Sequence, residues 1–434
     1  MCLARFAQKS LQNERGVALI LVLSAIVMLT MLIVEFAFDN QAEYRMAKYQ
    51  LERLQSYYLA QSADHLVKLE LKMNQMAAST IANSGFADQV QIDLSIPLCQ
   101  QFPMSSSIFR AALHGDLSGA PKEENAPQEN AAQGLLSGLP LQGGEEFLSF
   151  KGDFDGECVD ESSKINLNAF ATLNPEKQTT GIGPGADNPY DAYKKIIVAM
   201  LSQEQFKPLF EESMGSHNVK IEEIARNIAD WVDLNDTIND YNGVAVGSET
   251  AEYGDGGEPK NGKLSTPGDI FKIPGVEDKW WTAVSDYFTI YGDGKINVCR
   301  SSDELVTALI LRYTATRQDL PPIQQKDQEL LKALVKSVRT GCQGVQPNPT
   351  QIEAALNAKL GELLGATAPP GGATPAASKG GVFADWITGQ SRYYALKISG
   401  QVGDTVVKIT EVVDLGEGTG ADASKWKILY WRVD

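Results

Sequence analysis

Oxygen-bearing side chains gather in two short runs that flank a polar loop. Residues 230–236 read DWVDLND, residues 247–253 read GSETAEY, and the stretch 233–264 is rich in Gly, Asp and Asn. Calcium takes six to eight oxygen ligands from carboxylates, amides and carbonyls on flexible loops. Because this stretch has too few apolar residues to hold itself by burial, the sequence predicts that a bound cation organises it. A solvated acidic loop is the alternative. The EF-hand pattern fails because Ile238 stands where that loop needs Gly.

Enzymatic chemistry finds little support in the sequence. The three histidines, His65, His114 and His217, lack metal-ligand spacing. Neither a G-x-S-x-G motif nor a phosphate-binding loop occurs. Trp280 and Trp281 are interpreted as core residues rather than as a sugar platform. We therefore expect no catalytic residues and no enzyme, with a membrane-anchored periplasmic hydrolase kept as an alternative function.

An uncharged run near the N-terminus predicts a membrane-spanning helix. Residues 16–34 are 19 residues without a charge, close to the roughly 20 that a helix needs to cross a hydrocarbon core. Arg5, Lys9 and Arg15 precede the run and Glu35 follows it. Since positive charge stays in the cytoplasm, the bulk of the chain is expected outside. The prediction is a single-pass inner-membrane protein with its C-terminal domain in the periplasm.

The start of this run does not resemble an ordinary signal peptide, which carries a small-residue cleavage site after its apolar region. Instead, Gly16 separates the basic leader from the helix, which resembles the processing site of type IV prepilin-like proteins. The resemblance implies cleavage after Gly16 by a prepilin peptidase and methylation of the new terminus, Val17. Position five of the mature chain is Leu21, where such proteins usually have Glu to pair with a neighbour's terminal ammonium in the filament core. Leu21 therefore suits a tip subunit. A plain anchor with a chance glycine is the alternative.

Composition excludes some partners. The 434 residues are enough for an anchor and two domains, and 43% of them are hydrophobic. The net charge is −17, and the leader contributes +2, so the mature chain carries −19. Such an acidic chain is a poor ligand for nucleic acid, which needs a basic surface. The carboxylates remain available for a hard cation.

Four cysteines outside the leader fit an oxidising periplasm. Cys99, Cys158, Cys299 and Cys342 allow three pairings, and the sequence cannot choose among them. The pairing of nearest neighbours, Cys99 with Cys158 and Cys299 with Cys342, is favoured; buried free thiols are the alternative.

Periodicity predicts one long helix, a region of shorter helices and a terminal sheet. Residues 17–76 lack Pro and Gly and carry apolar residues at helical spacing, so one helix of about 60 residues is expected. Residues 392–400, 406–414 and 426–433 alternate, which predicts antiparallel strands with a tight turn at 402–405. Other helices are expected at 189–212, 219–232, 303–316, 325–339 and 350–364, two short ones in 266–291, strands at 89–98 and 147–153, a loop at 115–145 and a linker at 366–381.

The turn between the two short helices invites a second interpretation. The sequence IPGV at 273–276 resembles a helix-hairpin-helix, which binds the DNA backbone. That element needs a second glycine and basic residues nearby, whereas Glu277 and Asp278 follow here. We therefore expect this pair of helices to pack within the protein.

The order of several motifs resembles one family. The DWVD run, then GSE and a Tyr, lies between INLN at 165–168 and INV at 296–298. This order resembles minor pseudopilin K of type II secretion systems (general secretion pathway protein K), which also lacks the usual Glu at mature position five. The resemblance covers the N-terminal helix, residues 147–300 and the final strands, but not 301–381.

The resemblance implies a calcium site in a helical insertion. Carried over by position, the implied ligands are Asp233, Asn235 and Glu249, with Asp230, Asp236 and Glu252 in second rank. Asn235 and Thr250 stand where the family more often has Asp, which implies weaker binding.

The expected fold is α+β: a pilin-like long N-terminal helix packed on an antiparallel sheet, with a large helical insertion. The expected domains are a prepilin leader (1–16), a membrane and filament-core helix (17–80), the first part of the pilin-like head (81–168), an inserted helical domain (169–380) and the final strands of the head (381–434).

The resemblance implies a minor pseudopilin at the tip of the type II secretion pseudopilus, where it initiates or caps assembly for export of folded proteins across the outer membrane. The implied partners are minor pseudopilins I and J, the major pseudopilin, the prepilin peptidase and the inner-membrane secretion platform. A minor pilin of a type IV pilus or competence system is the alternative with the same anchor.

Overall fold

The computed structural model describes residues 14–84, 96–101, 104–107, 151–173, 188–213, 220–239, 245–249, 259–317, 320–321, 323–344, 347–364, 383–416 and 425–434. The chain divides into two compact units, each made of separate stretches. The first contains residues 1–63, 105–155 and 399–408, and the second contains residues 64–104, 156–398 and 409–434. The predicted loop at 115–145 and linker at 366–381 lie outside the described residues, as does most of the predicted strand at 89–98. The predicted domain boundaries remain predictions.

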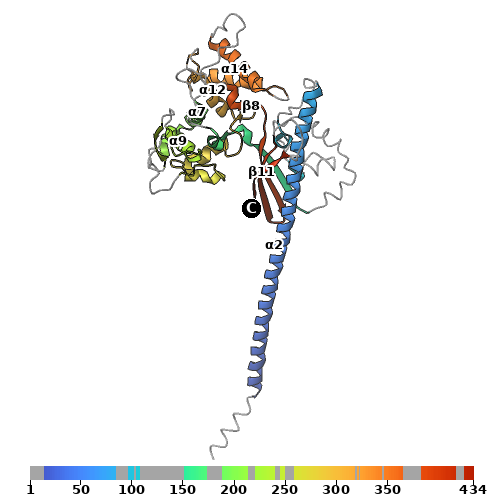
Figure 1. The fold of residues 1–434 in the computed structure, drawn as a ribbon. Coiled ribbons are helices and arrows are strands. Elements are labelled where there is room, and N and C mark those ends of the chain that lie inside the picture. Colours follow the sequence, from blue (N-terminus) through green and yellow to red (C-terminus); the bar gives the residue numbers. More distant parts are fainter. Residues whose placement is uncertain are drawn as a thin grey trace, which may run out of the picture. The chain divides into compact units, whose positions relative to one another are not determined.

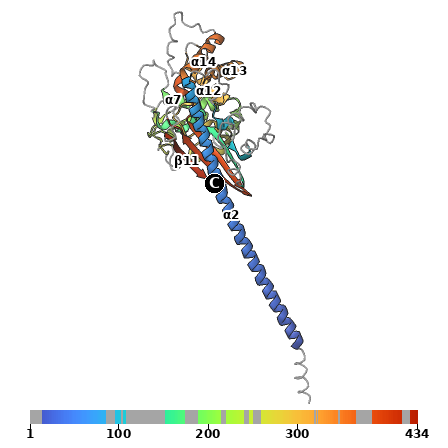
Figure 2. The same ribbon diagram turned by 90° about the vertical axis from the view of Figure 1, so that its right-hand side faces the viewer.

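One continuous helix, α2, runs from Glu14 to Ser84 over 71 residues (Figures 1 and 2). The prediction of a single long helix is confirmed, and the helix extends beyond the expected end because Gly85 is the first helix breaker after Gly16. Its first turns expose their apolar side chains; Leu21 is 64% exposed. Among the described helices it alone is long and apolar enough to cross a membrane.

Within the first unit, α2 packs closely against the ends of two strands, in residues 399–408. A side chain on Gly400 would lie 2.2 Å from the carbonyl oxygen of Ser56 and 2.6 Å from the backbone nitrogen of Ala60. The Ser56 hydroxyl donates to the Thr405 carbonyl at 3.0 Å. Glycine at 400 therefore lets the strand approach the helix backbone.

The strands form one five-stranded sheet in the order β1-β2-β9-β10-β11. Their bounds are β1 Met104–Ser105, β2 Asp153–Asp160, β9 Tyr393–Val402, β10 Thr405–Asp414 and β11 Lys427–Val433. β10 and β11 pair antiparallel, and Gly403, at φ 59°, makes the tight turn between β9 and β10. The last three strands match the alternating segments of the sequence. Most of the predicted strand 147–153 lies outside the described residues, and β2 begins at its last residue, Asp153. Buried residues alternate with exposed ones along β2 and include Phe154 and Cys158.

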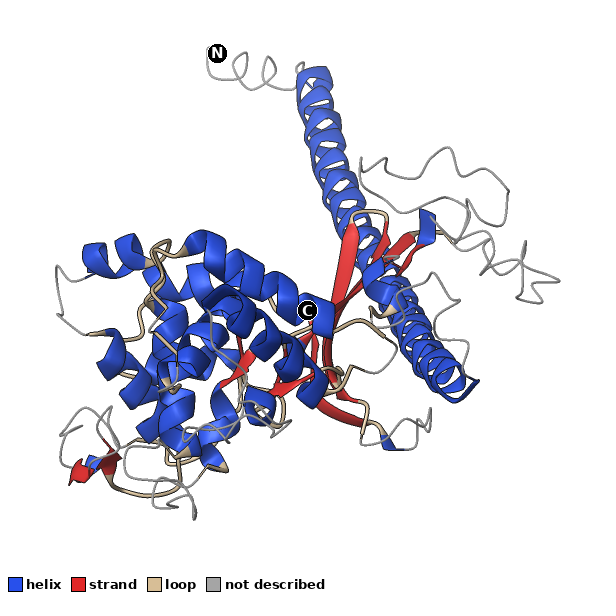
Figure 3. Cartoon of the chain, turned by 90° about the horizontal axis from the view of Figure 1, so that it is seen from above, coloured by secondary structure: helices blue, strands red, loops and turns tan. Residues whose placement is uncertain are grey.

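Neighbouring strands β2 and β9 are separated by the whole helical part of the chain, which Figure 3 shows as a group of packed helices. Its α-helices are α7 Pro189–Leu201, α8 Lys207–Ser213, α9 Ile221–Val232, α11 Asp278–Val284, α12 Asp303–Ala315, α13 Gln328–Gly341, α14 Pro349–Leu364 and α15 Phe383–Trp386; another short helix, α3, is Leu98–Gln101. Its 3₁₀ segments are η4 Glu161–Ser163, η5 Leu167–Ala171, η7 Pro267–Lys272 and η8 Ser285–Tyr287. The α+β class, with a long helix on an antiparallel sheet and additional helices, is confirmed.

Two short parallel pairs of strands begin and end this helical part. β3, Ile165–Asn166, pairs with β6, Phe288–Thr289; β7, Ile296–Asn297, pairs with β8, Ile387–Thr388. The repeated Ile-Asn has a local reason. Asn166 accepts a hydrogen bond from the Asn168 backbone, and Asn297 accepts one from the Cys299 backbone, each at 3.0 Å. Each asparagine thus turns the chain out of its strand.

One hydrophobic core joins these helices. The IPGV turn belongs to it: Ile273, Val276 and Trp280 are buried, and the Trp280 indole donates to the Gly275 carbonyl at 3.2 Å. The interpretation of this helix pair as packing fits these contacts. The predicted helix 189–212 is interrupted between α7 and α8, where the buried Gln203 amide donates to the Glu304 carbonyl at 2.8 Å.

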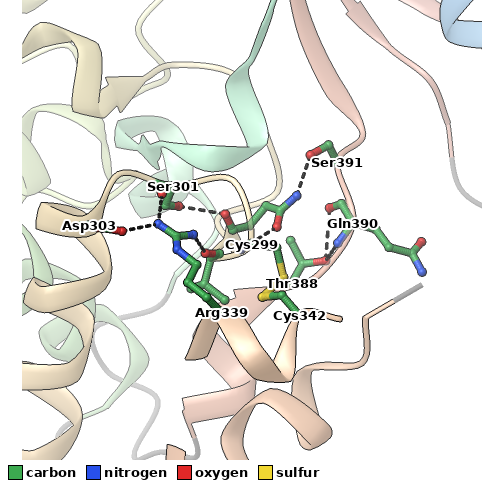
Figure 4. Close-up of a disulfide and its surroundings, with 10 residues drawn as sticks. Cys299, Ser301, Asp303, Arg339, Cys342, Thr388, Gln390 and Ser391 are labelled. Carbon is green, nitrogen blue, oxygen red and sulfur yellow. Dashed lines mark hydrogen bonds and ion pairs between the residues drawn. A yellow bond between two sulfur atoms is a disulfide. The ribbon is translucent and has the colours of Figure 1, made fainter. Parts of the chain in front are cut away.

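Both disulfides join nearest neighbours in the sequence. Cys99 bonds Cys158 and Cys299 bonds Cys342, with Cα–Cα distances of 5.8 and 5.5 Å. Figure 4 shows the second bond beside Arg339, whose guanidinium donates to the carbonyls of Val298 and Ser301 and pairs with Asp303 at 2.7 Å. The C-terminal end of α13 is therefore tied to the turn after β7 by both covalent and charged contacts.

Candidate metal centre

The end of α9 positions two carboxylates. α9 is strongly amphipathic, with Ile224, Ile228 and Val232 buried in the core. Asp230 lies in its last turn and is 2% exposed; Asp233 caps the helix with its N–H bonded to the Ala229 carbonyl at 2.9 Å. Two negative charges at the C-terminal end of a helix oppose its dipole. They need a positive charge nearby.

A short hairpin brings a third carboxylate to this place. β4, Ile238–Asn239, pairs antiparallel with β5, Ala245–Gly247. Glu249 follows β5 and is fully buried. One oxygen each of Asp230, Asp233 and Glu249 lies within 4.8 Å of the others. These three residues are called the acidic triad below.

Several oxygens of the acidic triad lack hydrogen-bond partners. Both carboxylate oxygens of Glu249 and the Oδ1 of Asp230 are buried with no donor among the described residues. An unpaired buried polar atom costs free energy comparable to a lost hydrogen bond. The site therefore stabilises negative charge poorly without a further cation.

The pKa values of the three triad carboxylates are all raised. Burial, and then the charges of Asp233 and Asp230, raise the pKa of Glu249 to about 8. Burial, and then Asp233, raise the pKa of Asp230 to about 7, although Lys194 and Arg226 oppose the shift. The pKa of Asp233 is also raised by burial, against a hydrogen bond from Tyr190. Three carboxylates that repel each other in a buried site are a suitable ligand set for a divalent cation.

α7 supplies the neighbours of the acidic triad. The Tyr190 hydroxyl donates to Asp233 Oδ2 at 2.7 Å. The Lys194 ammonium is fully buried; it lies 3.0 Å from Asp191 Oδ1 and 4.8 Å from the centre of the Tyr190 ring, and it donates to the Asn239 carbonyl at 3.4 Å. Sequence reasoning missed these residues because nothing in α7 marks it as a neighbour of α9.

The other predicted ligands, Asn235, Asp236 and Glu252, are not part of the acidic triad. Asn235 is half-buried, and its side-chain oxygen accepts from the Thr237 backbone at 2.7 Å. Asp236 is exposed and accepts from the Ser248 hydroxyl at 2.9 Å. Glu252 lies outside the described residues. The structure thus groups Asp233 and Glu249 with Asp230. The spacing of three residues between Asp230 and Asp233, which brings them to one helix face, was the available signal.

The acidic triad fits a hard cation. All its donors are oxygens, none is a sulfur or an imidazole, and several have no other partner. Carboxylate-only sets suit calcium, magnesium or manganese rather than zinc or copper. The triad could therefore bind a metal ion.

The predicted processing residues lie in the first turns of α2. Gly16 and Val17 are already helical, and Val17 is 59% exposed. Leu21 faces outward on the same helix.

The chain was compared with family models, curated proteins and solved structures. No family model and no curated protein matches the chain. Among solved structures, a chain of the GspK-GspI-GspJ complex from the type 2 secretion system of enterotoxigenic Escherichia coli is similar, with a TM-score of 0.47 and 13% sequence identity. The similarity covers 90% of this chain and 99% of that chain.

Proposed function

We propose that this chain is a minor pseudopilin at the tip of the type II secretion pseudopilus, where it initiates or caps assembly. One observation carries the proposal: the uncharged helix behind the basic leader and Gly16 continues without a break into the part of α2 that packs on the sheet. An ordinary membrane anchor does not need that continuity. A fibre subunit needs it, because the same helix must both enter the fibre and carry the head.

Assembly is the mechanism. The apolar half of α2 moves laterally from the bilayer into a bundle of similar helices, where it exchanges lipid contacts for helix packing. Leu21 enters that bundle without a charge to neutralise. The helical part between β2 and β9 enlarges the head, so that it fits where no further subunit is added above it. The proposed partners are minor pseudopilins I and J and the major pseudopilin, after processing by the prepilin peptidase at the inner-membrane platform.

The acidic triad is proposed to hold calcium. Asp230, Asp233 and Glu249 would supply the ligands, with other oxygens from the loops around them. The ion would supply positive charge at the C-terminal end of α9 and join that helix to the segment after β5. The role proposed for the ion is structural.

The mature N-terminus tests the proposed function. Mass spectrometry of the protein purified from membranes should find a chain that begins with methylated Val17. Gly16→Leu should leave the leader attached and prevent co-purification with the major pseudopilin, whereas the leader substitution Gln8→Leu should change neither. An intact Met1 on functional protein, or a processed chain that never co-purifies with a fibre component, would overturn the proposal.

A further inference from the structure

β11 forms one edge of the sheet and is unusually open. It pairs with β10 on one side and with no other strand in the described part of the chain. Every residue from Lys427 to Val433 is exposed or half-buried. By contrast, the strand at the opposite edge, β1, is only two residues long. β11 therefore presents a long row of unpaired backbone groups.

The side chains of β11 are mainly apolar. Ile428 is 60% exposed, Leu429 43%, Trp431 40% and Val433 40%. Proteins protect such edges by short strands, charges or a covering element, because an open apolar edge recruits other chains. A register shift at Val412 and Val413 is the one interruption in its pairing with β10. The composition of this edge is that of a surface that another polypeptide covers.

A groove adjoins β11 on the side that faces α2. It has a volume of about 400 Å³ and lies between α2 and the strands β10 and β11. Register places Glu411 opposite Trp431 and Val413 opposite Ile428, so Trp431 and Ile428 share the face of Glu411 and Val413. Lys68 on α2 confirms the orientation, because its ammonium lies 5.8 Å from the centre of the Trp431 ring.

The groove is basic in an acidic protein. His65, Lys68, Lys72 and Lys427 line it, and Lys68 is already paired with Asp64 and Glu411 at 2.8 and 2.7 Å. Lys72 and Lys427 form no ion pair with a described residue, although Lys427 lies near enough to Asp414 to help lower the pKa of that carboxyl. The chain as a whole carries −17. This local excess of positive charge is complementary to an acidic ligand.

Two further features favour a polypeptide over a small anion. Trp426 lines the groove, and its indole N–H has no hydrogen-bond partner among the described residues. Exposed apolar side chains, Leu69 on α2 and Ile428 on β11, stand beside the cations. A mixed wall of this kind suits acidic and apolar side chains that alternate along an extended chain.

We infer that an extended, acidic segment of a neighbouring subunit docks on β11 as an added strand. Its backbone pairs with the free edge, its apolar side chains cover Ile428 and Trp431, and its carboxylates enter the groove beside Lys72 and Lys427. Such strand addition obtains affinity from backbone hydrogen bonds and specificity from alternate side chains. The inference rests on the proposed function for the kind of neighbour, another pilin-like subunit.

Hydrogen exchange on the full-length chain in detergent tests the inference. The amides of β11 are compared in the chain alone and in its complex with the co-expressed minor pseudopilins. We expect exchange in β11 to slow by at least about tenfold in the complex, as newly paired amides do. The double variant Lys72→Glu/Lys427→Glu should weaken the complex by about tenfold, the equivalent of about 1.4 kcal/mol, and Ile428→Asp should weaken it as well.

A matched control separates local from general charge effects. Lys326→Glu makes the same change at an exposed lysine outside the groove and should leave affinity unchanged. A complex that forms without protecting β11 overturns the inference and leaves the proposed function standing. If the β11 amides are protected equally in the wild type and in Lys72→Glu/Lys427→Glu, the docked segment is not acidic and the inference fails. If β11 is already protected in the chain alone, its own chain or a second copy covers it, and the inference fails. If no complex forms with any minor pseudopilin, the partnership and the inference fail together.

Discussion

Asp233 connects the end of α9 to the acidic triad, so its removal should abolish the effect of calcium on stability. At a calcium concentration about 100 times Kd, binding would stabilise the full-length protein by about 2.7 kcal/mol. A chelator should therefore lower the Tm of the wild type by several degrees and leave the Tm of Asp233→Ala unchanged, as measured by calorimetry. Asp286→Ala, at an exposed carboxylate, should retain the wild-type response. No effect of chelator on the wild type would show that the triad holds no such ion.

Lys194 already supplies positive charge beside the acidic triad, so it should compete with the metal. Removal of Lys194 alone would leave Asp191 as a buried, unpaired charge, at a cost of about 3–5 kcal/mol. The double variant Lys194→Met/Asp191→Asn avoids that cost. The variant removes one positive and one negative charge, but of these two it is Lys194 whose charge shifts the pKa values of Asp230 and Asp233, against the effect of burial. We therefore expect the variant to bind calcium about tenfold more tightly in titration calorimetry, because the repelling charge that acts on the ligands is gone. Unchanged affinity would restrict Lys194 to a packing role.

Asp160 should make stability depend on pH. Its carboxylate is 3% exposed and accepts hydrogen bonds from the Ser162 backbone, at 2.9 Å, and from Ser391. Burial raises its pKa to about 6, although both hydrogen bonds oppose the shift. The unfolded value is about 3.9. Between these two values the folded chain binds more protons than the unfolded chain, so this carboxylate lowers stability as pH rises.

The matching experiment uses Asp160→Asn, which cannot titrate. Relative to the wild type, its free energy of unfolding should improve by about 2 kcal/mol between pH 4 and pH 7, from about 1.4 kcal/mol per pKa unit, because the unfolded carboxyl is already half ionised at about pH 4. Denaturant unfolding at constant calcium measures the difference. A difference that is the same at both pH values would contradict the assignment.

At the scale of elements, the approach of β9 to α2 depends on one glycine. Gly400→Ala would place a methyl group 2.2 Å from the Ser56 carbonyl, so helix and strand must separate. Overpacking of this kind costs about 1–3 kcal/mol. We expect a lower Tm and faster hydrogen exchange in residues 52–60.

Gly268→Ala is the matched control for that variant. The nearest atom to its new side chain would be the Thr266 hydroxyl at 3.9 Å, an ordinary contact distance. Its exchange in residues 52–60 should equal that of the wild type. Equal effects of the two variants would show that the close approach at Gly400 is not needed.

Some helices and strands could be predicted from the sequence alone, and others could not. α2 and the final strands were predictable because their patterns extend over many residues, with helical spacing in one and alternation in the others. The interruption after Leu201 was not, since it depends on Gln203 reaching Glu304, a contact across the fold. The composition of residues 233–264 did identify a polar, acidic stretch as a candidate for cation binding. The triad itself required the hairpin of β4 and β5, which no pattern in residues 238–247 predicts.

At the scale of the whole molecule, Leu21 should matter for assembly and not for folding of the head. Leu21→Glu would bring a carboxylate into an apolar helix bundle at a position with no partner above it, at a cost of about 2.5–3.5 kcal/mol. Less of the variant should co-purify with the major pseudopilin, and its Tm should be unchanged. Leu21→Ile, which keeps the apolar side chain, should assemble normally. Normal assembly of Leu21→Glu would contradict the proposed position at the tip.

The insertion between β2 and β9 also affects how the chain is made. Tyr393 and Ser162 are hydrogen-bonded across a sequence separation of 231 residues. Contacts of such high sequence separation slow folding, because loop closure must precede the contacts that stabilise it. During synthesis, β2 is made before its neighbour β9, and the helices between them can fold while β2 is still unpaired. The incomplete sheet, with an unpaired strand edge, is therefore the stage at which the newly made chain is most exposed to aggregation.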